Sequence, residues 1–178
     1  MQSDIYLPRA VCFTGHRPEK FPFDTTNELY LKMFRSLLYM HICDAVRDGY
    51  DTFYCGMQRG MDIWAGQQVL AVKRIQPSVR LICVSPYERE INSRRGKEYA
   101  DYVELRDNCD EFIPLRRDYA QGCFFDRNRY MVDRSGYIIG AISDPKSGTA
   151  QTLAYAERNG LKVHRIDLLR FAEDYNLH

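Results

Sequence analysis

Three segments of the sequence place glycine and small polar residues directly after a short apolar run, where a strand would end. They extend from Thr14 to Pro18, from Gly56 to Asp62 and from Ser143 to Thr152. A small-residue turn between a strand and a helix leaves backbone N–H groups free, and such groups bind anions. Three turns of this kind on one sheet edge predict a ligand site suited to phosphate or carboxylate.

The third segment contains the strongest ligand-binding candidates, Ser147, Gly148 and Thr149. A glycine and a hydroxyl at the start of a helix can receive a phosphate through backbone and side-chain donors. An N-cap function explains the hydroxyl of Thr149 without any ligand. Both interpretations place this turn at the beginning of a helix.

The first segment adds Thr14, Gly15, His16 and Arg17 as ligand-binding candidates. Gly15 would let the backbone approach a ligand closely, and His16 and Arg17 carry donors for a phosphate or a polar base edge. The alternative interpretation is a tight turn whose side chains are solvated.

The second segment adds Gly56, Gly60 and Asp62. Gly56 permits the turn, and Gly60 permits the following helix to approach its strand closely. Asp62 falls in the first helical turn, where a carboxylate either contacts a ligand or offsets the helix dipole.

Two arginines farther along the chain, Arg127 and Arg129, are also candidates for ligand binding. Residues two positions apart point to different sides of a helix, so one of them is expected to face the site. The alternative is a surface helix on which Asp126 and Asp133 pair with the arginines.

The composition excludes several classes of function. The chain has 178 residues, a formal net charge of +1 and 28% charged residues, which fits one domain over residues 1–178 without a general attraction to nucleic acid or lipid. No apolar run approaches the roughly 20 residues of a membrane span, and we expect a cytoplasmic protein. The six cysteines show no Cys-x-x-Cys spacing, so no metal site is predicted.

Short apolar runs alternate with segments of helical period along the whole chain. The alternation predicts an α/β fold, a Rossmann-like three-layer sandwich with a mainly parallel sheet of about six strands. Ligands of such sheets bind at the carboxyl ends of the strands. The segment from Pro86 to Arg95 is expected to be a loop that could cover the site. The expected strands are 10–13, 52–55, 79–84, 111–115, 137–142 and 162–166, and the expected helices are 28–47, 61–75, 96–108, 124–135 and 149–159.

Four segments together resemble the YpsA-like family of the SLOG superfamily, which also holds the DprA/Smf and LOG proteins. They are Thr14 to Pro18, Gly56 to Asp62, Arg127 to Asp133 and Ser147 to Ala156, and the resemblance covers nearly the whole chain. It implies a Rossmann-like domain that binds a nucleotide or a nucleotide-derived ligand and requires no further cofactor. Since relatives often pair through helices, it also implies a homodimer.

The sequence departs from the enzymatic LOG relatives at the last of these turns. Their motif is Pro-Gly-Gly-x-Gly-Thr-x-x-Glu; aligned on Gly148 and Thr149, the glutamate falls at Thr152 and the double glycine at Lys146-Ser147. A threonine cannot supply the carboxylate for N-glycosidic cleavage. Asp62 or Glu88 would have to replace it as the catalytic group.

Three functions therefore remain as hypotheses. The first is a module that binds or senses a nucleotide-type small molecule, and the second is a hydrolase resembling the nucleoside 5'-monophosphate phosphoribohydrolases. The third is DNA binding by analogy with DprA, for which the sequence offers a local basic cluster at Arg89, Arg94, Arg95 and Lys97. The near-neutral net charge disfavours a nucleic-acid partner, and a membrane partner is not expected.

Overall fold

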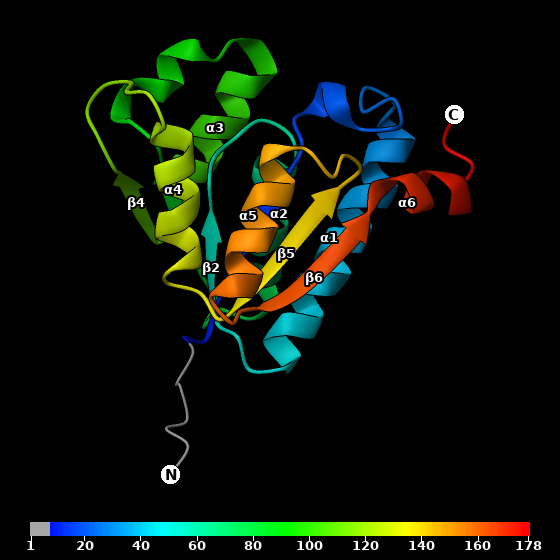
Figure 1. Cartoon of the computed structure of the whole chain (residues 1–178), viewed down its shortest axis with the longest axis horizontal. Helices are drawn as coiled ribbons and strands as arrows, with labels where there is room; N and C mark the ends of the chain where they lie inside the picture. The colour runs from blue at the N-terminus through cyan, green and yellow to red at the C-terminus, as the bar shows by residue number, and fades with distance from the viewer. Residues whose placement is uncertain (1–7) are drawn as a thin grey trace.

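Six parallel strands form a single sheet at the centre of the computed structural model, which describes residues 8–178 (Figure 1). The strand order is β4-β3-β2-β1-β5-β6. The predicted α/β Rossmann-like fold is confirmed. The strands are β1 (Ala10–Gly15), β2 (Thr52–Cys55), β3 (Arg80–Ser85), β4 (Glu111–Pro114), β5 (Tyr137–Ile142) and β6 (Lys162–Asp167).

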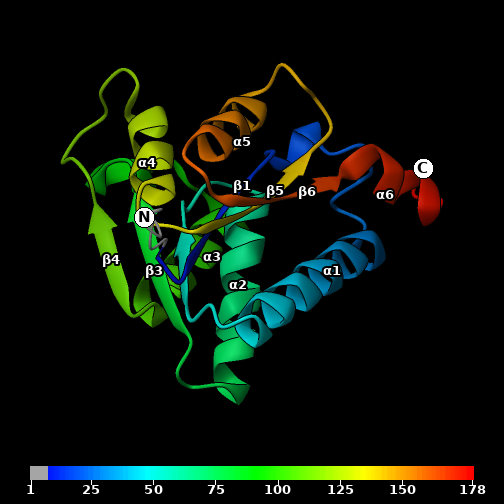
Figure 2. The same ribbon diagram turned by 60° about the horizontal axis from the view of Figure 1, so that its bottom comes forward.

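Helices cover both faces of the sheet (Figure 2). Helices α1, α2 and α3 pack on one face, and α4 and α5 pack on the other. The expected helices agree with the observed ones to within a few residues. The helices are α1 (Glu28–Arg47), α2 (Met61–Ile75), α3 (Gly96–Asn108), α4 (Cys123–Val132), α5 (Gly148–Arg158) and α6 (Leu168–Asp174).

Helix α6 was not expected from the sequence, although its pattern is visible there. Leu168, Phe171 and Ala172 recur at three- and four-residue spacing and are buried. Asp167 caps the helix by accepting a hydrogen bond from the N–H of Arg170 at 3.0 Å. The helix thus continues the core beyond the last strand.

The strand order reverses at β1: β2, β3 and β4 follow it on one side of the sheet, and β5 and β6 follow on the other. This reversal opens a crevice at the carboxyl ends of β1 and β5, where ligands of open parallel sheets bind. The first and third glycine-marked turns follow these two strands, and the second follows β2. All three turns therefore lie on one edge of the sheet, as predicted.

A cluster of aromatic rings fills the core between the sheet and α1. Trp64 makes edge-on contacts with Phe21 and Phe34 at ring-centroid distances of 5.2 and 6.2 Å, and Phe171 of α6 packs against Phe34 at 5.7 Å. Trp64 is buried within this cluster.

The expected loop between Pro86 and Arg95 is partly helical, which corrects the prediction. Residues Glu88–Ser93 form a 3-10 helix, η2. Glu90 and Arg94 are buried, and their side chains form an ion pair at 2.7 Å. An ion pair held inside the protein fixes this segment in place. Over residues 8–178, no helix has the length and apolar character needed to cross a bilayer.

Candidate ligand-binding site

A cavity of about 390 Å³ lies at the carboxyl ends of β1 and β5. Its volume falls within the range of roughly 300–1,000 Å³ that is usual for small-molecule sites. Nine residues that the sequence singled out line it: Thr14, Gly15, His16, Arg17, Asp62, Arg127, Ser147, Gly148 and Thr149. Glu19, Lys20, Gln58, Phe124 and Asn128 complete the lining. We call this cavity the anion compartment, because free backbone donors and cations dominate it.

The start of α5 forms one wall of the anion compartment. The hydroxyl of Ser147 caps the helix by accepting a hydrogen bond from the N–H of Ala150 at 3.2 Å. The backbone N–H groups of Gly148 and Thr149 donate to no atom within residues 8–178. No atom of residues 8–178 lies within 4 Å of the position that a Cβ of Gly148 would take, so the helix start is open on this side. The arrangement leaves two amide donors free for an anion.

His16 connects the turn after β1 to the start of α5. Its Nε2 accepts a hydrogen bond from the N–H of Ser143 at 3.0 Å, and its Nδ1 lies 3.5 Å from the hydroxyl oxygen of Thr149. Because a backbone N–H can only donate, Nε2 is unprotonated and Nδ1 carries the proton. Burial lowers the pKa of His16 below its usual value, with nearby Asp144 opposing the shift and Lys20 adding to it. His16 is therefore a neutral residue that positions Thr149.

Asp62 and Arg127 form a buried pair on the opposite wall. Their carboxylate and guanidinium atoms lie 3.8 Å apart, and Asp62 also accepts a hydrogen bond from the N–H of Gln58 at 3.3 Å. Burial raises the pKa of Asp62 to about 6, against the opposing effect of Arg127. A carboxyl group with this pKa can exchange a proton near neutral pH.

Gly56 makes room for the buried pair. A Cβ at this position would lie 2.7 Å from Oδ2 of Asp62 and 3.0 Å from Cζ of Arg127. The guanidinium of Arg127 donates to the carbonyl oxygen of Gly56 and, through Nε, to the side-chain oxygen of Asn128 at 2.9 Å. Gly56 itself lies beneath the cavity and does not line it.

Two cations at the mouth of the anion compartment are available to a ligand. Arg17 and Lys20 are exposed and form no ion pair with any residue in the range 8–178. Glu19, between them, pairs with Arg59 at 2.9 Å. The free positive charge at the mouth favours an anionic ligand.

Gly15 lines the anion compartment and also has a packing function that the sequence did not predict. A Cβ there would lie 2.3 Å from Cγ of Met61, so the missing side chain lets α2 pack against β1. Gly60, with φ of +84°, similarly lies against the carbonyl oxygen of His16, 2.6 Å from its would-be Cβ. The start of α2 therefore packs closely against the turn after β1 at Gly60, which does not line the anion compartment.

Arg129 and Glu88 lie outside the anion compartment. Only one of the two arginines of α4 faces this cavity, in accordance with helix geometry: Arg127 lines it, whereas the guanidinium of Arg129 lies over the rings of Phe125 and Tyr155, at 4.3 and 5.1 Å. Glu88 is exposed on η2. Of the two carboxylates that could replace the missing glutamate, Asp62 alone lies in the cavity.

Thr152, at the position of the LOG glutamate, connects α5 to α4 through hydrogen bonds. Its hydroxyl donates to the carbonyl oxygen of Gly148 and accepts from the side-chain nitrogen of Asn128, both at 3.0 Å. Sequence reasoning missed Asn128, and it also missed Gln58 and Phe124. Gln58 lies within the predicted turn from Gly56 to Asp62. Its residue type and position do not indicate whether its side chain faces the site, and only the fold shows that it does.

The family model with the name YpsA, described as the YspA SLOG family, matches residues 11–171. This chain belongs to that family. It is 21% identical to a UPF0398 protein of Halalkalibacterium halodurans over 79% of this chain and 76% of the relative. It is 19% identical to a UPF0398 protein of Bacillus cereus over 79% of this chain and 78% of the relative.

Two solved structures share the fold of this YpsA-family chain. DNA processing protein A from Helicobacter pylori, described for its single-stranded DNA binding mode, gives a TM-score of 0.56 at 17% identity, covering 96% of this chain and 74% of that one. DprA from Streptococcus pneumoniae gives a TM-score of 0.59 at 18% identity, covering 89% of this chain and 50% of that one. At identities this low, the structural similarity shows a common fold and nothing further.

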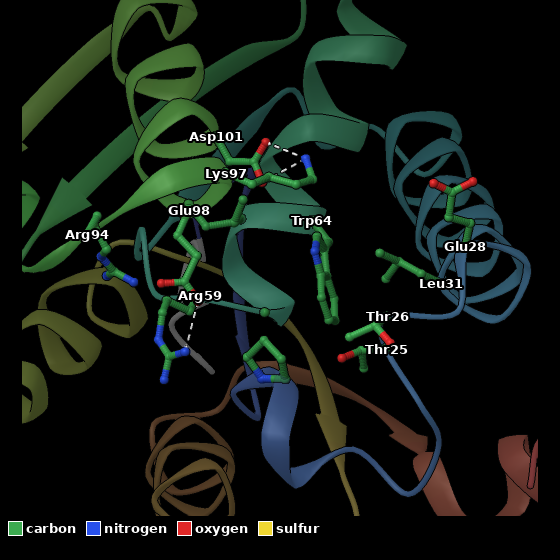
Figure 3. Close-up of a pocket in the computed structure, with 13 residues that line it drawn as sticks. Thr25, Thr26, Glu28, Leu31, Arg59, Trp64, Arg94, Lys97, Glu98 and Asp101 are labelled. Carbon is green, nitrogen blue, oxygen red and sulfur yellow. Dashed lines mark hydrogen bonds and ion pairs between the residues drawn. The ribbon is translucent and has the colours of Figure 1, made fainter.

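Three of the four cations that the sequence offered for DNA are paired or buried in this YpsA-family chain. Arg89 pairs with Asp118 at 2.9 Å, Lys97 pairs with Asp101 at 2.9 Å, and Arg94 is buried with Glu90. The fourth, Arg95, donates to the carbonyl oxygens of Asn92 and Arg94 and has no carboxylate partner within residues 8–178. Figure 3 shows Lys97 turned toward Asp101 beside a separate cavity of about 410 Å³ between the starts of α1, α2 and α3. Paired and buried cations contribute little to binding a phosphate backbone.

Proposed function

We propose that this YpsA-family chain binds a nucleotide or a nucleotide-derived small molecule and acts as a ligand-binding or sensing module. The anionic group of the ligand lies in the anion compartment, at the start of α5. One observation carries the proposal: two amide groups and two cations without partners in residues 8–178 line the same cavity. The amide groups belong to Gly148 and Thr149, and the cations are Arg17 and Lys20. Backbone donors, a helix dipole and exposed cations together suit a phosphate group.

A substitution at Gly148 tests the proposal. Gly148→Asp places a carboxylate at the open helix start, where no atom in the described part of the chain, residues 8–178, lies within 4 Å of the new Cβ. The fold should tolerate the change, and the added charge should repel an anion. Gly148→Ala is the matched control, because it adds the same Cβ without the charge.

The assay is a thermal-shift and calorimetry screen of the four nucleoside 5'-monophosphates, ribose 5-phosphate, NAD, ADP-ribose, cyclic dinucleotides and inorganic phosphate. A ligand at one hundred times its Kd adds about 2.7 kcal/mol to the stability, which raises the Tm measurably. We expect binding that survives Gly148→Ala and is lost in Gly148→Asp. Equal affinity in both variants would overturn the anion compartment as the phosphate site. A labelled single-stranded oligonucleotide in the same screen tests the DNA-binding alternative.

A second function, hydrolysis of the N-glycosidic bond of a nucleoside 5'-monophosphate, is favoured by one observation, the Asp62 carboxyl group in the same cavity with a pKa of about 6. In this reaction water adds across the bond and releases the free base and ribose 5-phosphate. The developing positive charge on the sugar would be stabilised by the carboxylate form of Asp62. Release of base from a bound nucleotide, lost in Asp62→Asn, would establish the hydrolase; binding without release leaves the sensing function.

A further inference from the structure

A second cavity, of about 470 Å³, adjoins the anion compartment. Three residues, Arg17, Gln58 and Phe124, line both cavities, so the two are neighbouring parts of one depression along the carboxyl edge of the sheet. The second cavity also includes Tyr87 and Glu90, and we call it the ring compartment for its aromatic wall.

Two aromatic side chains form that wall. Tyr87, just before η2, and Phe124, near the start of α4, are half-buried, and their ring centroids lie 6.4 Å apart in an edge-to-face arrangement. The guanidinium of Arg127 lies 5.8 Å from the ring centroid of Phe124. Phe124 therefore lies at the junction of the two compartments. It contacts Arg127, which belongs to the anion compartment, and Tyr87, which belongs to the ring compartment.

Gln58 supplies a fixed hydrogen-bond donor at the same junction. Its side-chain oxygen accepts from the backbone N–H of Arg59 at 3.0 Å and from the guanidinium of Arg94 at 3.2 Å. These two bonds fix the orientation of the carboxamide, and its NH2 group donates to no atom of the part of the chain described here, residues 8–178. An oriented, unused NH2 group can read a hydrogen-bond acceptor on a ligand.

Arg94 holds Gln58 in place beside the ring compartment. Its side chain is 4% exposed, and it lines this compartment and two further cavities. One guanidinium nitrogen, Nη2, donates to Glu90, to Gln58 and to the carbonyl oxygen of Met57. Its Nε, in contrast, is the one buried side-chain nitrogen or oxygen within residues 8–178 that has no hydrogen-bond partner. A buried donor without a partner is costly.

We infer that the ring compartment holds a flat heteroaromatic ring, a nucleobase, belonging to the ligand whose phosphate lies in the anion compartment. The inference rests on the proposed function and names the ligand class within it: a nucleoside 5'-phosphate or a longer derivative, and not a phosphosugar or inorganic phosphate. The ring lies against Tyr87 and Phe124, and an acceptor on its edge faces the NH2 group of Gln58. Adding a base to a phosphosugar thus adds contacts to a separate part of the site.

The test compares two probes, AMP and ribose 5-phosphate, which differ by the base alone. Calorimetry on the full chain should show tighter binding of AMP than of ribose 5-phosphate. Tyr87 lines the ring compartment but not the anion compartment. Tyr87→Ala should therefore weaken AMP binding by about ten-fold or more, the usual contribution of one stacked base, and leave ribose 5-phosphate binding unchanged. Tyr87→Leu, which keeps apolar bulk without a flat ring, should behave in the same way and guards against a folding defect.

Tyr119→Ala is the matched control. Tyr119 belongs to the same aromatic cluster, 5.9 Å from the ring of Tyr87, but is 65% exposed and lines neither compartment, so its removal should change neither affinity. Gln58→Glu replaces the NH2 group with an acceptor and should alter the preference among AMP, GMP, CMP and UMP.

The outcomes separate the inference from the proposed function. Equal affinity for AMP and ribose 5-phosphate, or an equal loss of both in Tyr87→Ala, would overturn the ring compartment while the anion compartment stands. If neither probe binds and Gly148→Asp changes nothing, the proposed function itself is wrong, and the inference is overturned with it.

Discussion

Because of Asp62, the free energy of unfolding should depend on pH, with a sign and a size that follow from the pKa of this residue. The folded protein raises the pKa of this carboxyl group from 3.8 to about 6 by burying it. A group with a raised pKa stabilises the fold below its unfolded pKa, and the contribution is lost as the pH rises through the folded pKa. A rise of about two pKa units corresponds to about 3 kcal/mol, with a slope of about 1.4 kcal/mol per pH unit between pH 4 and 6.

The perturbation is Asp62→Asn, which removes the titration. The variant leaves Arg127 without its carboxylate partner, but an arginine does not titrate in this range, so that cost is constant with pH. The free energy of unfolding of the variant, relative to that of the parent, should therefore rise by about 2 kcal/mol between pH 4.5 and 7. Urea unfolding can be followed through the fluorescence of the single tryptophan, Trp64, which is buried.

Asp110→Asn is the control with the opposite sign. Partial burial of Asp110 works to raise its pKa, but the hydrogen bonds from Lys73 and from the N–H of Leu81 outweigh burial and hold the pKa below the usual value. Its stabilising contribution is present above pH 3.8 and is lost as the pH falls. The free energies of unfolding of Asp62→Asn and of the parent could instead differ by an amount that stays constant, within about 0.5 kcal/mol, from pH 4.5 to 7. That result would refute the burial argument and exclude Asp62 as an acid–base candidate.

Three further substitutions or measurements test the framework of the site. Gly15→Ala should lower the free energy of unfolding by about 1–3 kcal/mol, because its Cβ would overlap Met61. Gly148→Ala should change the free energy of unfolding by about 0.5 kcal/mol or less. Similar values for the two variants would contradict the assigned packing. Ser147→Ala removes a helix cap and should cost about 1 kcal/mol by the same urea assay. Nitrogen-15 NMR of His16 should show the proton on Nδ1, with a pKa below 6.5, so that its contribution to stability is lost as the pH falls; a proton on Nε2 would exclude the hydrogen bond assigned to that atom.

The order and type of the elements were predictable from the sequence, because periodicity is a local property. Leu31, Phe34, Leu37 and Leu38 recur at helical spacing in α1, and the apolar run of β5 is bounded by polar turns. An alternation of strands and helices allows few arrangements other than a parallel sheet covered on both faces. The 3-10 helix η2 escaped prediction because Glu90 and Arg94 look like surface charges until the fold buries them together.

The sheet edge on which the site lies also followed from the sequence. In a parallel sheet all carboxyl ends lie on one edge, so residues after β1, β2 and β5 must meet there once the strands are adjacent. Nine of the named candidates line one cavity for this reason.

The tertiary structure alone decided what each of those residues does. The missing side chain of Gly15 makes room for Met61, Arg127 faces the cavity while Arg129 does not, and Asp62 has a raised pKa. Each of these facts depends on distances and burial among residues far apart in the chain. The sequence determines which groups reach the edge of the sheet, whereas packing determines which of them are neutralised, which are buried and which stay free for a ligand.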